Sequence, residues 1–419
     1  DLPDLITGWW DTPVYNEYGQ KGAFAPLDDL MSVMPTLESW FAKRPDLKAV
    51  LKCPDGHVYA LPQICDRELG VWSGMAYRTD WLEELKLEVP KSLDQYYEVL
   101  KAFKERDSNC FPLANNPSWI LWQYGVSGVT WWQDPFCLDG KAVRYGPMEP
   151  GHLEGCDYIR KLWSEGLLDT EYGTMNDTQL VQRFGSTAGS AICWTSHMGQ
   201  TEKVFAKDGV SPSPWQPALF PAGPMSPVQN VLSSTYVSLQ NGGGIVQSGK
   251  NKDLMARYMD LWYTESGATL FNWGIFGDTY VEEDGKKKFT DKVLKSGLNP
   301  SEYVWNYVSP QWIGPGWRTG EGFLAHVGPQ GANAVMQWVK AESQILLPPL
   351  TFSDDEQALI KERMPDIGTL ASEVVAGYIS GTKTLTDYNN MLATIKGAGI
   401  EDVLAVYQGA FERFQAALS

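Results

Sequence analysis

Short apolar runs alternate with amphipathic stretches along the first quarter of the chain. Residues 57–62 follow an Asp-Gly turn and are typical of a strand, and residues 71–77 predict a second strand that leads into a helix over 79–85. Ser92 is placed to cap a helix over 93–104, in which apolar residues recur at helical spacing. This alternation indicates an α/β fold.

The same alternation continues through the middle of the chain. Asp139-Gly140 predicts a hairpin, and residues 151–165 predict an amphipathic helix. A helix capped by Asn176 is expected to run through Phe184, and residues 189–194 are typical of a buried strand. The middle of the chain therefore adds further strand and helix units.

The last part of the chain changes from mixed to helical. Six prolines within 211–227 predict irregular chain, and residues 236–239 predict a strand. Helices are expected over 252–264, around 330–342 and through most of 353–417. The pattern indicates one or two open sheets covered by helices, followed by a helical tail.

Length and charge narrow the class of protein. The chain has 419 residues, enough for two to three domains, and its net charge is −17. Nucleic acid and anionic membrane surfaces are therefore poor partners. No apolar run is long enough to cross a bilayer.

The sequence offers little for metal or cofactor chemistry. Six cysteines form no CxxC pair and four histidines form no HExxH motif, so no metal and no cofactor are expected. A disulfide such as Cys53 with Cys65 stays open. Glycoside hydrolysis also stays open, because it needs only two carboxylates and 51 acidic residues are candidates.

Tryptophan is the unusual component, with 18 residues. Trp40, Trp163, Trp262 and Trp338 each lie at helical spacing from other apolar residues of their own segment, and they are expected in the core. Others lie in loops or at strand ends beside Asn, Asp and Gly, a setting that suits a sugar site, which needs both flat apolar faces and hydrogen bonders. A half-covered ring contributes about 2–3 kcal/mol, so a few rings can hold an oligosaccharide at micromolar affinity.

Several segments resemble the family 1 extracellular solute-binding proteins that serve ABC sugar importers. The likeness lies in Leu2-Pro3-Asp4-Leu5-Ile6, in the turn over 56–62, in the Tyr-Arg-x-Asp-Trp-Leu segment over 77–82 with its continuation over 89–94, and in residues 265–286. The last of these, together with the tail segments 379–381 and 399–413, is similar to the oligosaccharide-type branch that includes alginate-binding and maltose-binding proteins.

The resemblance implies a fold. It is α/β with two discontinuous lobes of the type II periplasmic-binding kind, a hinge and a helical C-terminal tail. Lobe 1 is expected over residues 1–112 plus 240–315 and lobe 2 over 113–239 plus 316–419. The chain would cross between the lobes near 110–116, near 234–240 and again around 305–325.

The resemblance also implies ligand-binding residues in a cleft between the lobes. Family members usually carry an exported signal and a first strand-helix unit before the Pro-Asp strand, and the chain as given lacks them. The calcium loop of the alginate-binding branch is expected to be absent after residue 104. The implied ligand contacts are Trp9, Trp10, Asp11, Gln63, Asp66, Asn116, Trp119, Trp194, Trp273, Trp312 and Trp317.

The function implied is that of a non-catalytic receptor. It would capture an oligosaccharide and deliver it to the membrane permease of an ABC transporter, as a monomer, outside the cell and anchored as a lipoprotein or in the periplasm. A peptide or polyol ligand is the alternative within binding, and a secreted carbohydrate-active enzyme is the alternative in another class. The acidic balance favours a neutral sugar over a uronate.

Overall fold

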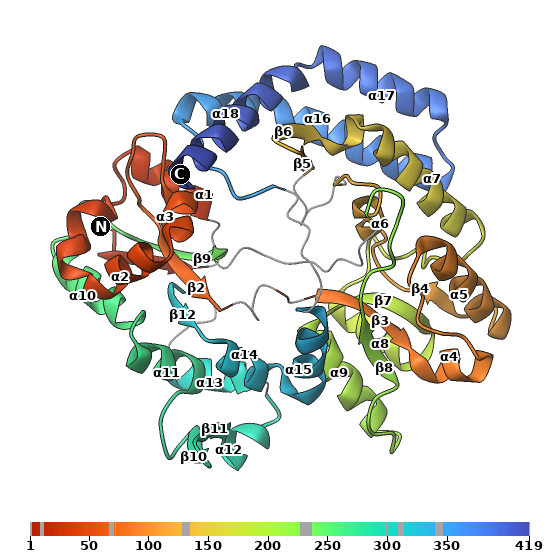
Figure 1. Ribbon diagram of the computed structural model, residues 1–419, viewed down its shortest axis with the longest axis horizontal. Helices are drawn as coiled ribbons and strands as arrows, with labels where there is room; N and C mark the ends of the chain where they lie inside the picture. Colours follow the sequence, from red (N-terminus) through yellow and green to blue (C-terminus); the bar gives the residue numbers. More distant parts are fainter. Residues whose placement is uncertain are drawn as a thin grey trace.

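The computed structural model describes residues 2–8, 12–66, 71, 73–127, 135–226, 237–298, 300–308, 314–339 and 347–418. These residues form two four-stranded sheets, each covered by helices, and a helical tail (Figure 1). The predicted α/β architecture is confirmed.

Sheet 1 has the strand order β1-β9-β2-β12. Its strands are β1 (Leu5–Gly8), β9 (Val237–Ile245), β2 (Leu61–Cys65) and β12 (Gly316–Arg318). β9 is antiparallel to β1 and β2, and β12 is parallel to β2. Three of the four strands therefore run in the same direction.

Sheet 2 has the strand order β4-β7-β3-β8. Its strands are β4 (Phe111–Leu113), β7 (Ala188–Trp194), β3 (Ser73–Arg78) and β8 (Trp215–Ala218). β3 is antiparallel to β7 and β8, and β4 is parallel to β7. Again three strands share one direction. Two hairpins stand apart from the sheets: β5 (Phe136–Asp139) with β6 (Ala142–Tyr145), and β10 (Tyr280–Glu283) with β11 (Lys286–Phe289).

The sheets and the helices around them define two lobes. We call residues 2–66 and 237–326 lobe 1, and residues 71–226 and 328–339 lobe 2. The helices of lobe 1 are α1 (Thr12–Gln20), the 3₁₀ helix η1 (Leu27–Val33), α2 (Pro35–Lys43), α3 (Pro45–Leu51), α10 (Lys252–Leu261), α11 (Glu265–Trp273), α12 (Asp291–Leu294), α13 (Pro300–Val308) and α14 (Gly320–His326). The helices of lobe 2 are α4 (Thr79–Leu85), α5 (Leu93–Arg106), α6 (Trp119–Trp122), the 3₁₀ helix η3 (Gly146–Met148), α7 (Pro150–Ser164), α8 (Asp177–Ser186), α9 (Thr195–Ala206) and α15 (Gly328–Trp338).

Strand pairing moves the predicted lobe boundaries. β3 and β4 belong to sheet 2, so residues 73–112 lie in lobe 2 and the first crossing falls at 66–73, well before 110–116. β12 pairs with β2, so residues 316–326 stay with lobe 1. The expected boundaries are wrong at these two places because a strand's pattern shows that it is buried but does not show which partner it pairs with.

Local sequence signals produce many of the elements as predicted. The Ser92 hydroxyl accepts a hydrogen bond from the backbone N–H of Gln95 (3.3 Å) at the start of α5. Asn176 forms a capping box with Gln179 at the start of α8. The Asp139-Gly140 hairpin is present, with Gly140 at φ 62°. These motifs act within a few residues, which is why the sequence alone was sufficient.

Three elements differ from expectation. The strand expected over 57–62 lies at Leu61–Cys65. Residues 119–128 predict a helix from their sequence, but α6 ends at Trp122, and Gly125 shortly afterwards has φ 74°, a left-handed conformation that ends helices. Within the proline-rich segment, β8 forms although it contains Pro217. β8 is an edge strand of sheet 2, and an edge is where a sheet tolerates a residue without a backbone N–H.

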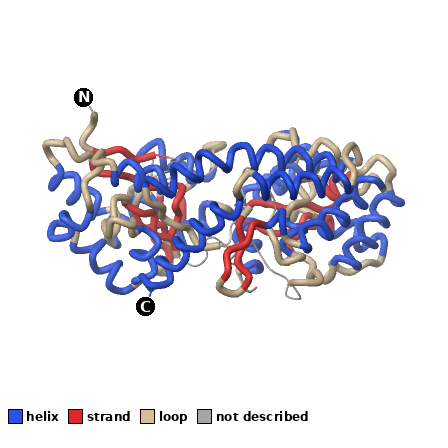
Figure 2. The backbone as a smooth tube through the Cα atoms, turned by 90° about the horizontal axis from the view of Figure 1, so that it is seen from above, coloured by secondary structure: helices blue, strands red, loops and turns tan. Residues whose placement is uncertain are grey.

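The tail comprises α16 (Asp354–Ser380), α17 (Leu385–Gly397) and α18 (Ile400–Leu418). Tail residues such as Ile367, Val374 and Ile395 are buried in the same apolar core as α5 and α7 of lobe 2. Seen from above, the tail helices run from the side of one lobe to that of the other (Figure 2). The helical tail predicted over 353–417 is confirmed.

The structure corrects the prediction for Trp119. This side chain is fully buried in the lobe 2 core, with its ring 5.1 Å from Phe220 and 5.5 Å from Tyr96. It offers no face to a ligand in this arrangement. Among the tryptophans expected in the core, Trp262 and Trp338 are buried as predicted, whereas Trp40 and Trp163 are half-buried.

We expect Trp119→Ala to lower the free energy of unfolding of lobe 2 by about 3–5 kcal/mol, because it leaves a large cavity in a packed core. Urea denaturation followed by circular dichroism measures the loss. Trp163→Ala, which removes a half-buried ring, is the matched control and should cost clearly less. Equal losses in the two variants would contradict the placement of Trp119.

Candidate functional site

The strand directions bring predicted site residues to one edge of sheet 1. β1, β2 and β12 run the same way, so their carboxyl ends lie at a common edge. Asp66 follows β2 and Thr319 follows β12 at this edge. Trp9, Trp10 and Asp11, which follow β1 in the sequence, lie outside the described residues, as does Trp312. Open α/β sheets bind ligands at such carboxyl edges.

Sheet 2 presents a similar edge. β7 ends at Trp194, and Asn116 lies three residues beyond the end of β4. Trp194 pairs with Ser73, the first residue of β3. Asp66 and Ser73 are seven residues apart in the chain, a span of at most about 25 Å. The carboxyl edge of sheet 1 is thus tied by a short connection to the carboxyl edge of sheet 2 (Figure 1).

Asp66 holds Trp317 in place. One carboxylate oxygen of Asp66 accepts a hydrogen bond from the Trp317 indole N–H (3.0 Å), and the other accepts one from the backbone N–H of Gly320 (2.9 Å) at the start of α14. The indole is also fixed by an edge contact with Trp40, at 5.1 Å between ring centroids. Asp66 therefore orients an aromatic ring at the site.

Asn272 is a second positioning residue, and sequence reasoning missed it. Its side chain is fully buried and joins α11 to β12: its amide NH₂ donates to the carbonyl oxygens of Ala268 (2.7 Å) and Trp317 (3.1 Å), and its side-chain oxygen accepts from the Thr319 N–H (3.1 Å). It stands directly before the predicted Trp273. The signal in the sequence is its position between Phe271 and Trp273, because a polar side chain inside an apolar segment needs hydrogen-bond partners once it is buried.

A cavity of about 220 Å³ lies beside Trp317. It is formed between α11, β11, the end of β12 and the start of α14. Two carboxylates, one ammonium group and two threonine hydroxyls reach it, and the ammonium of Lys287 lies 3.9 Å from the carboxylate of Glu321. Its lining residues are Glu265, Ala268, Thr269, Trp273, Lys287, Trp317, Thr319 and Glu321. Of these, the sequence pointed only to the two tryptophans, because the others come from separate segments without a shared motif.

Two further candidates are more buried than expected. Trp273 lines the cavity but is only 2% exposed, with its ring 4.8 Å from that of Phe289. Gln63 is 1% exposed and donates to the carbonyl oxygen of Gly314 (3.1 Å). The prediction that Gln63 faces a ligand is therefore corrected: it ties β2 to the chain that enters β12.

Trp194 and Asn116 are the described candidates on lobe 2 that keep accessible surface. Both are half-buried. The Asn116 side-chain oxygen accepts a hydrogen bond from the Ser118 N–H (2.9 Å), which orients the amide. The backbone N–H of Trp194 donates to the imidazole of the buried His197 (3.3 Å). Lobe 2 thus offers one aromatic ring and one amide at its carboxyl edge.

Burial sets the protonation of the ionisable groups behind lobe 1's edge. Burial, together with the nearby Arg318, lowers the pKa of His326 to about 3, so this imidazole is neutral at neutral pH and donates to the Asn272 carbonyl oxygen. Burial also lowers the pKa of Arg318 to about 10, which leaves it charged at neutral pH. These two buried groups therefore keep their protonation states around neutral pH.

The described residues contain no group of three or more His, Cys, Asp or Glu that could hold a metal ion. All six cysteines are buried thiols, so the disulfide left open between Cys53 and Cys65 is not formed. In the described part of the chain, no helix is long and apolar enough to cross a membrane.

The arrangement of two sheets, each with helices, joined by several crossings is that of the two-lobed type II periplasmic-binding fold. The structure is similar over 98% of the chain to the alginate-binding protein AlgQ2 without calcium ion, with a TM-score of 0.80, 25% identity and 86% of that chain covered. It is also similar to the Streptococcus pneumoniae ABC-transporter substrate-binding protein FusA in complex with kestose, with a TM-score of 0.77, 21% identity, and 99% and 89% of the two chains covered.

The sequence places the protein more narrowly. Residues 1–269 match the family of bacterial extracellular solute-binding proteins, and the chain belongs to that family. It is 29% identical to the fructooligosaccharide substrate-binding protein FusA of Streptococcus pneumoniae over 311 residues, 66% of this chain and 54% of the relative. It is 29% identical to lipoprotein LipO of Bacillus subtilis over 279 residues, 59% of this chain and 51% of the relative. These alignments span about half the length of the curated relatives. The family is one of binding proteins, which decides against the enzyme alternative.

We expect Asp66→Ala to lower the free energy of unfolding by about 1–3 kcal/mol, because the Trp317 and Gly320 N–H groups lose their acceptor. Urea denaturation measures this change. Asp208→Ala, at an exposed turn after α9, serves as the control and should change stability little. If the two variants are equally stable, Asp66 does not position Trp317 as described.

Proposed function

We propose that the protein captures a neutral oligosaccharide between its two lobes and delivers it to the membrane permease of an ABC importer. The observation that carries this proposal is the placement of two half-buried tryptophans, Trp317 and Trp194, at the carboxyl edges of sheets that a short connection ties together. Flat apolar rings with amide and hydroxyl neighbours are what pyranose and furanose rings require. The likeness to FusA, a fructooligosaccharide substrate-binding protein, supports the same class of ligand.

The charge around lobe 1's edge supports a neutral sugar. The cavity beside Trp317 is lined by Glu265 and Glu321 against Lys287 alone, and the whole chain carries a net charge of −17. A polyuronate would therefore meet unfavourable negative charge both in the cavity and over the protein as a whole. AlgQ2 is an alginate-binding protein, and YtcQ of Bacillus subtilis, a further relative, is a polygalacturonan/rhamnogalacturonan-binding protein. Alginate and polygalacturonan are such polyanions. We therefore infer a preference different from theirs.

The residues are assigned distinct roles. Trp317 and Trp194 stack on sugar rings, Asn116 and Thr319 offer hydrogen bonds to hydroxyl groups, and Asp66 keeps Trp317 oriented. Trp9, Trp10, Asp11 and Trp312 stay in the proposed site on the resemblance in sequence alone.

Partner and location follow from the same proposal. The permease of an ABC importer is the proposed partner, and the protein is proposed to act as a monomer without nucleic acid. Anchoring to the membrane through a lipid is proposed from the likeness to lipoprotein LipO. Calcium is not assigned a role.

We expect calorimetry to show binding of a neutral oligosaccharide from a panel of kestose, nystose, xylotriose and mannotriose, with a Kd of about 1–10 µM, or roughly 7–8 kcal/mol. Alginate and galacturonate trisaccharides should bind at least about tenfold more weakly, because their carboxylates meet the acidic surface. Chromatography of the recovered sugar should find it intact. Tighter binding of the uronates, or cleavage of the sugar, would contradict the proposal.

We expect Trp194→Ala and Trp317→Ala each to weaken binding of the best ligand by about 30- to 150-fold, because a stacked ring contributes about 2–3 kcal/mol. Trp163→Ala, a half-buried tryptophan of α7 remote from both edges in the chain, is the control and should leave Kd unchanged. Wild-type affinity in both test variants would show that the site lies elsewhere.

A further inference from the structure

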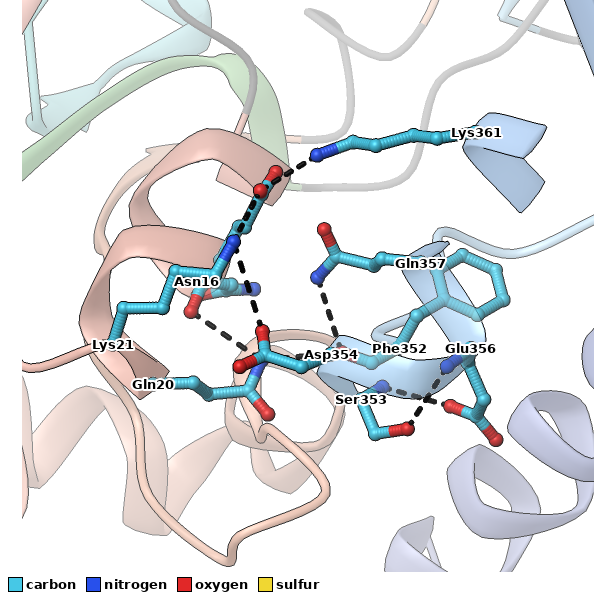
Figure 3. Close-up of polar contacts among 10 residues, drawn as sticks. Asn16, Gln20, Lys21, Phe352, Ser353, Asp354, Glu356, Gln357 and Lys361 are labelled. Carbon is cyan, nitrogen blue, oxygen red and sulfur yellow. Dashed lines mark hydrogen bonds and ion pairs between the residues drawn. The ribbon is translucent and has the colours of Figure 1, made fainter. Parts of the chain in front are cut away.

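The tail is attached to the two lobes by different kinds of contact. On lobe 2, the C-terminal half of α16 is buried in the apolar core through residues that include Ile367, Val374 and Tyr378. On lobe 1, the segment 351–361, which includes the start of α16, meets α1 through hydrogen bonds and an ion pair (Figure 3), and α18 lies against α3. α16 has 27 residues and is about 40 Å long, and its two ends contact different lobes.

The polar contacts with lobe 1 form a compact group, which we call the clamp. The ammonium of Lys361 lies 2.6 Å from the Glu17 carboxylate, which also accepts from Lys21 (2.7 Å). Lys21 in turn lies 3.9 Å from Asp354. These four charges alternate in sign across the seam between α1 and α16. Together the two ammonium groups hold the pKa of Glu17 below its ordinary value.

Two hydrogen bonds extend the clamp. The Gln20 side-chain amide donates to the carbonyl oxygen of Phe352 (3.1 Å), and the Thr351 hydroxyl donates to the carbonyl oxygen of Lys52 (2.7 Å) after α3. On the tail side, Arg413 of α18 binds the Glu356 carboxylate (2.7 and 2.9 Å), so the end of α18 and the start of α16 are joined. The clamp therefore connects lobe 1 to two of the three tail helices, α16 directly and α18 through Arg413.

The seam beneath the clamp is incompletely packed. A cavity of about 190 Å³ lies between α1 and the tail, lined by Leu350, Phe352 and Ile360 among others. Asn16, which also lines it, is 4% exposed, and its side-chain oxygen has no hydrogen-bond partner among the described residues. Next to the clamp, the seam therefore keeps open space and a buried acceptor that no described residue satisfies.

Pro365 separates the two halves of α16. Proline has no backbone N–H, so the carbonyl oxygen of Lys361 receives no helical hydrogen bond from residue 365. The break falls between the last clamp residue, Lys361, and the first buried residue of the anchored half, Ile367. Prolines inside helices are a common cause of bending. α16 is thus weakened where a movement of one lobe against the other would bend it.

We propose that the clamp stabilises the arrangement of the two lobes seen in this structure, and that the clamp contacts break or rearrange when one lobe moves against the other. In that movement α16 bends at Pro365. α1 begins directly after residues 9–11, which the sequence predicts as ligand contacts, so the clamp and the ligand act on the same helix. The free energy of the clamp then forms part of the apparent binding affinity. This inference rests in part on the proposed function, because it assumes that ligand binding changes the lobe arrangement.

The test compares variants with opposite effects on the tail. Lys361→Met and Glu17→Gln weaken the clamp, and Pro365→Ala restores a helical hydrogen bond and stiffens α16. Lys396→Met is the matched control, because Lys396 pairs with Glu401 (3.6 Å) within the tail. Small-angle X-ray scattering of the ligand-free variants measures the maximum dimension, and calorimetry with kestose measures Kd.

We expect Lys361→Met and Pro365→Ala to shift the ligand-free maximum dimension in opposite directions, with no shift for Lys396→Met. Kd should change by about twofold to fivefold, also in opposite directions, since partly exposed ion pairs contribute modestly. Variants that become more compact should bind more tightly. Combining Glu17→Gln with Lys361→Met should add little to either single change, because both remove the same contact.

Salt provides an independent check. Raising NaCl from about 50 to 500 mM should shift the wild-type dimension in the direction of Lys361→Met and leave that variant almost unchanged, because the clamp's charges are partly exposed. Identical dimensions in all variants, or shifts of the same sign for Lys361→Met and Pro365→Ala, would overturn the proposal. The scattering experiment needs no ligand, so failure of kestose to bind would count against the proposed function and leave the clamp to be judged on its own.

Discussion

The connection between β2 and β3 is the constraint on which the rest of the structure depends. The chain leaves one sheet at Cys65 and enters another at Ser73, so two separate cores must lie within the reach of a few residues. Both sheets run three of their four strands in one direction, and the connection joins the carboxyl edge of sheet 1 to that of sheet 2. The proposed site between the lobes depends on this connectivity, because it keeps the two carboxyl edges within that reach.

Polar groups at lobe 1's edge serve mainly to fix an aromatic ring. Asp66 and Asn272 together satisfy the indole N–H and carbonyl of Trp317 and the backbone N–H of Thr319 and Gly320. A ring held in this way loses little conformational freedom when a ligand stacks on it, so more of the contact energy is kept as affinity. A charged residue near a sugar site can therefore raise the affinity without touching the sugar, because it orients the aromatic ring on which the sugar stacks.

The sequence predicted most elements whose signals are local. The Ser92 and Asn176 caps, the Asp139-Gly140 hairpin and the amphipathic helices each depend on residues a few positions apart. Strand partners depend on distant residues, and so the expected lobe boundaries were wrong at β3 and β12. Trp119 was misjudged for a related reason. The residues just before it include the polar Asn115, Asn116 and Ser118, yet Tyr96 and Phe220, which contact its ring, come from distant parts of the chain. The cavity beside Trp317 draws on four segments, which no single-sequence pattern joins.

The tail shows how one element can be fixed to one lobe and adjustable toward the other. Burial of apolar side chains in the lobe 2 core is non-directional and strong, so the anchored half of α16 moves with that lobe. Partly exposed ion pairs and single hydrogen bonds contribute little each and can be broken or replaced by water at small cost. A receptor that binds and releases its ligand needs lobe arrangements separated by only a few kcal/mol. The apolar core that holds the tail is separate from that of lobe 1, and ion pairs and hydrogen bonds join α16 to α1, so this gap can stay small.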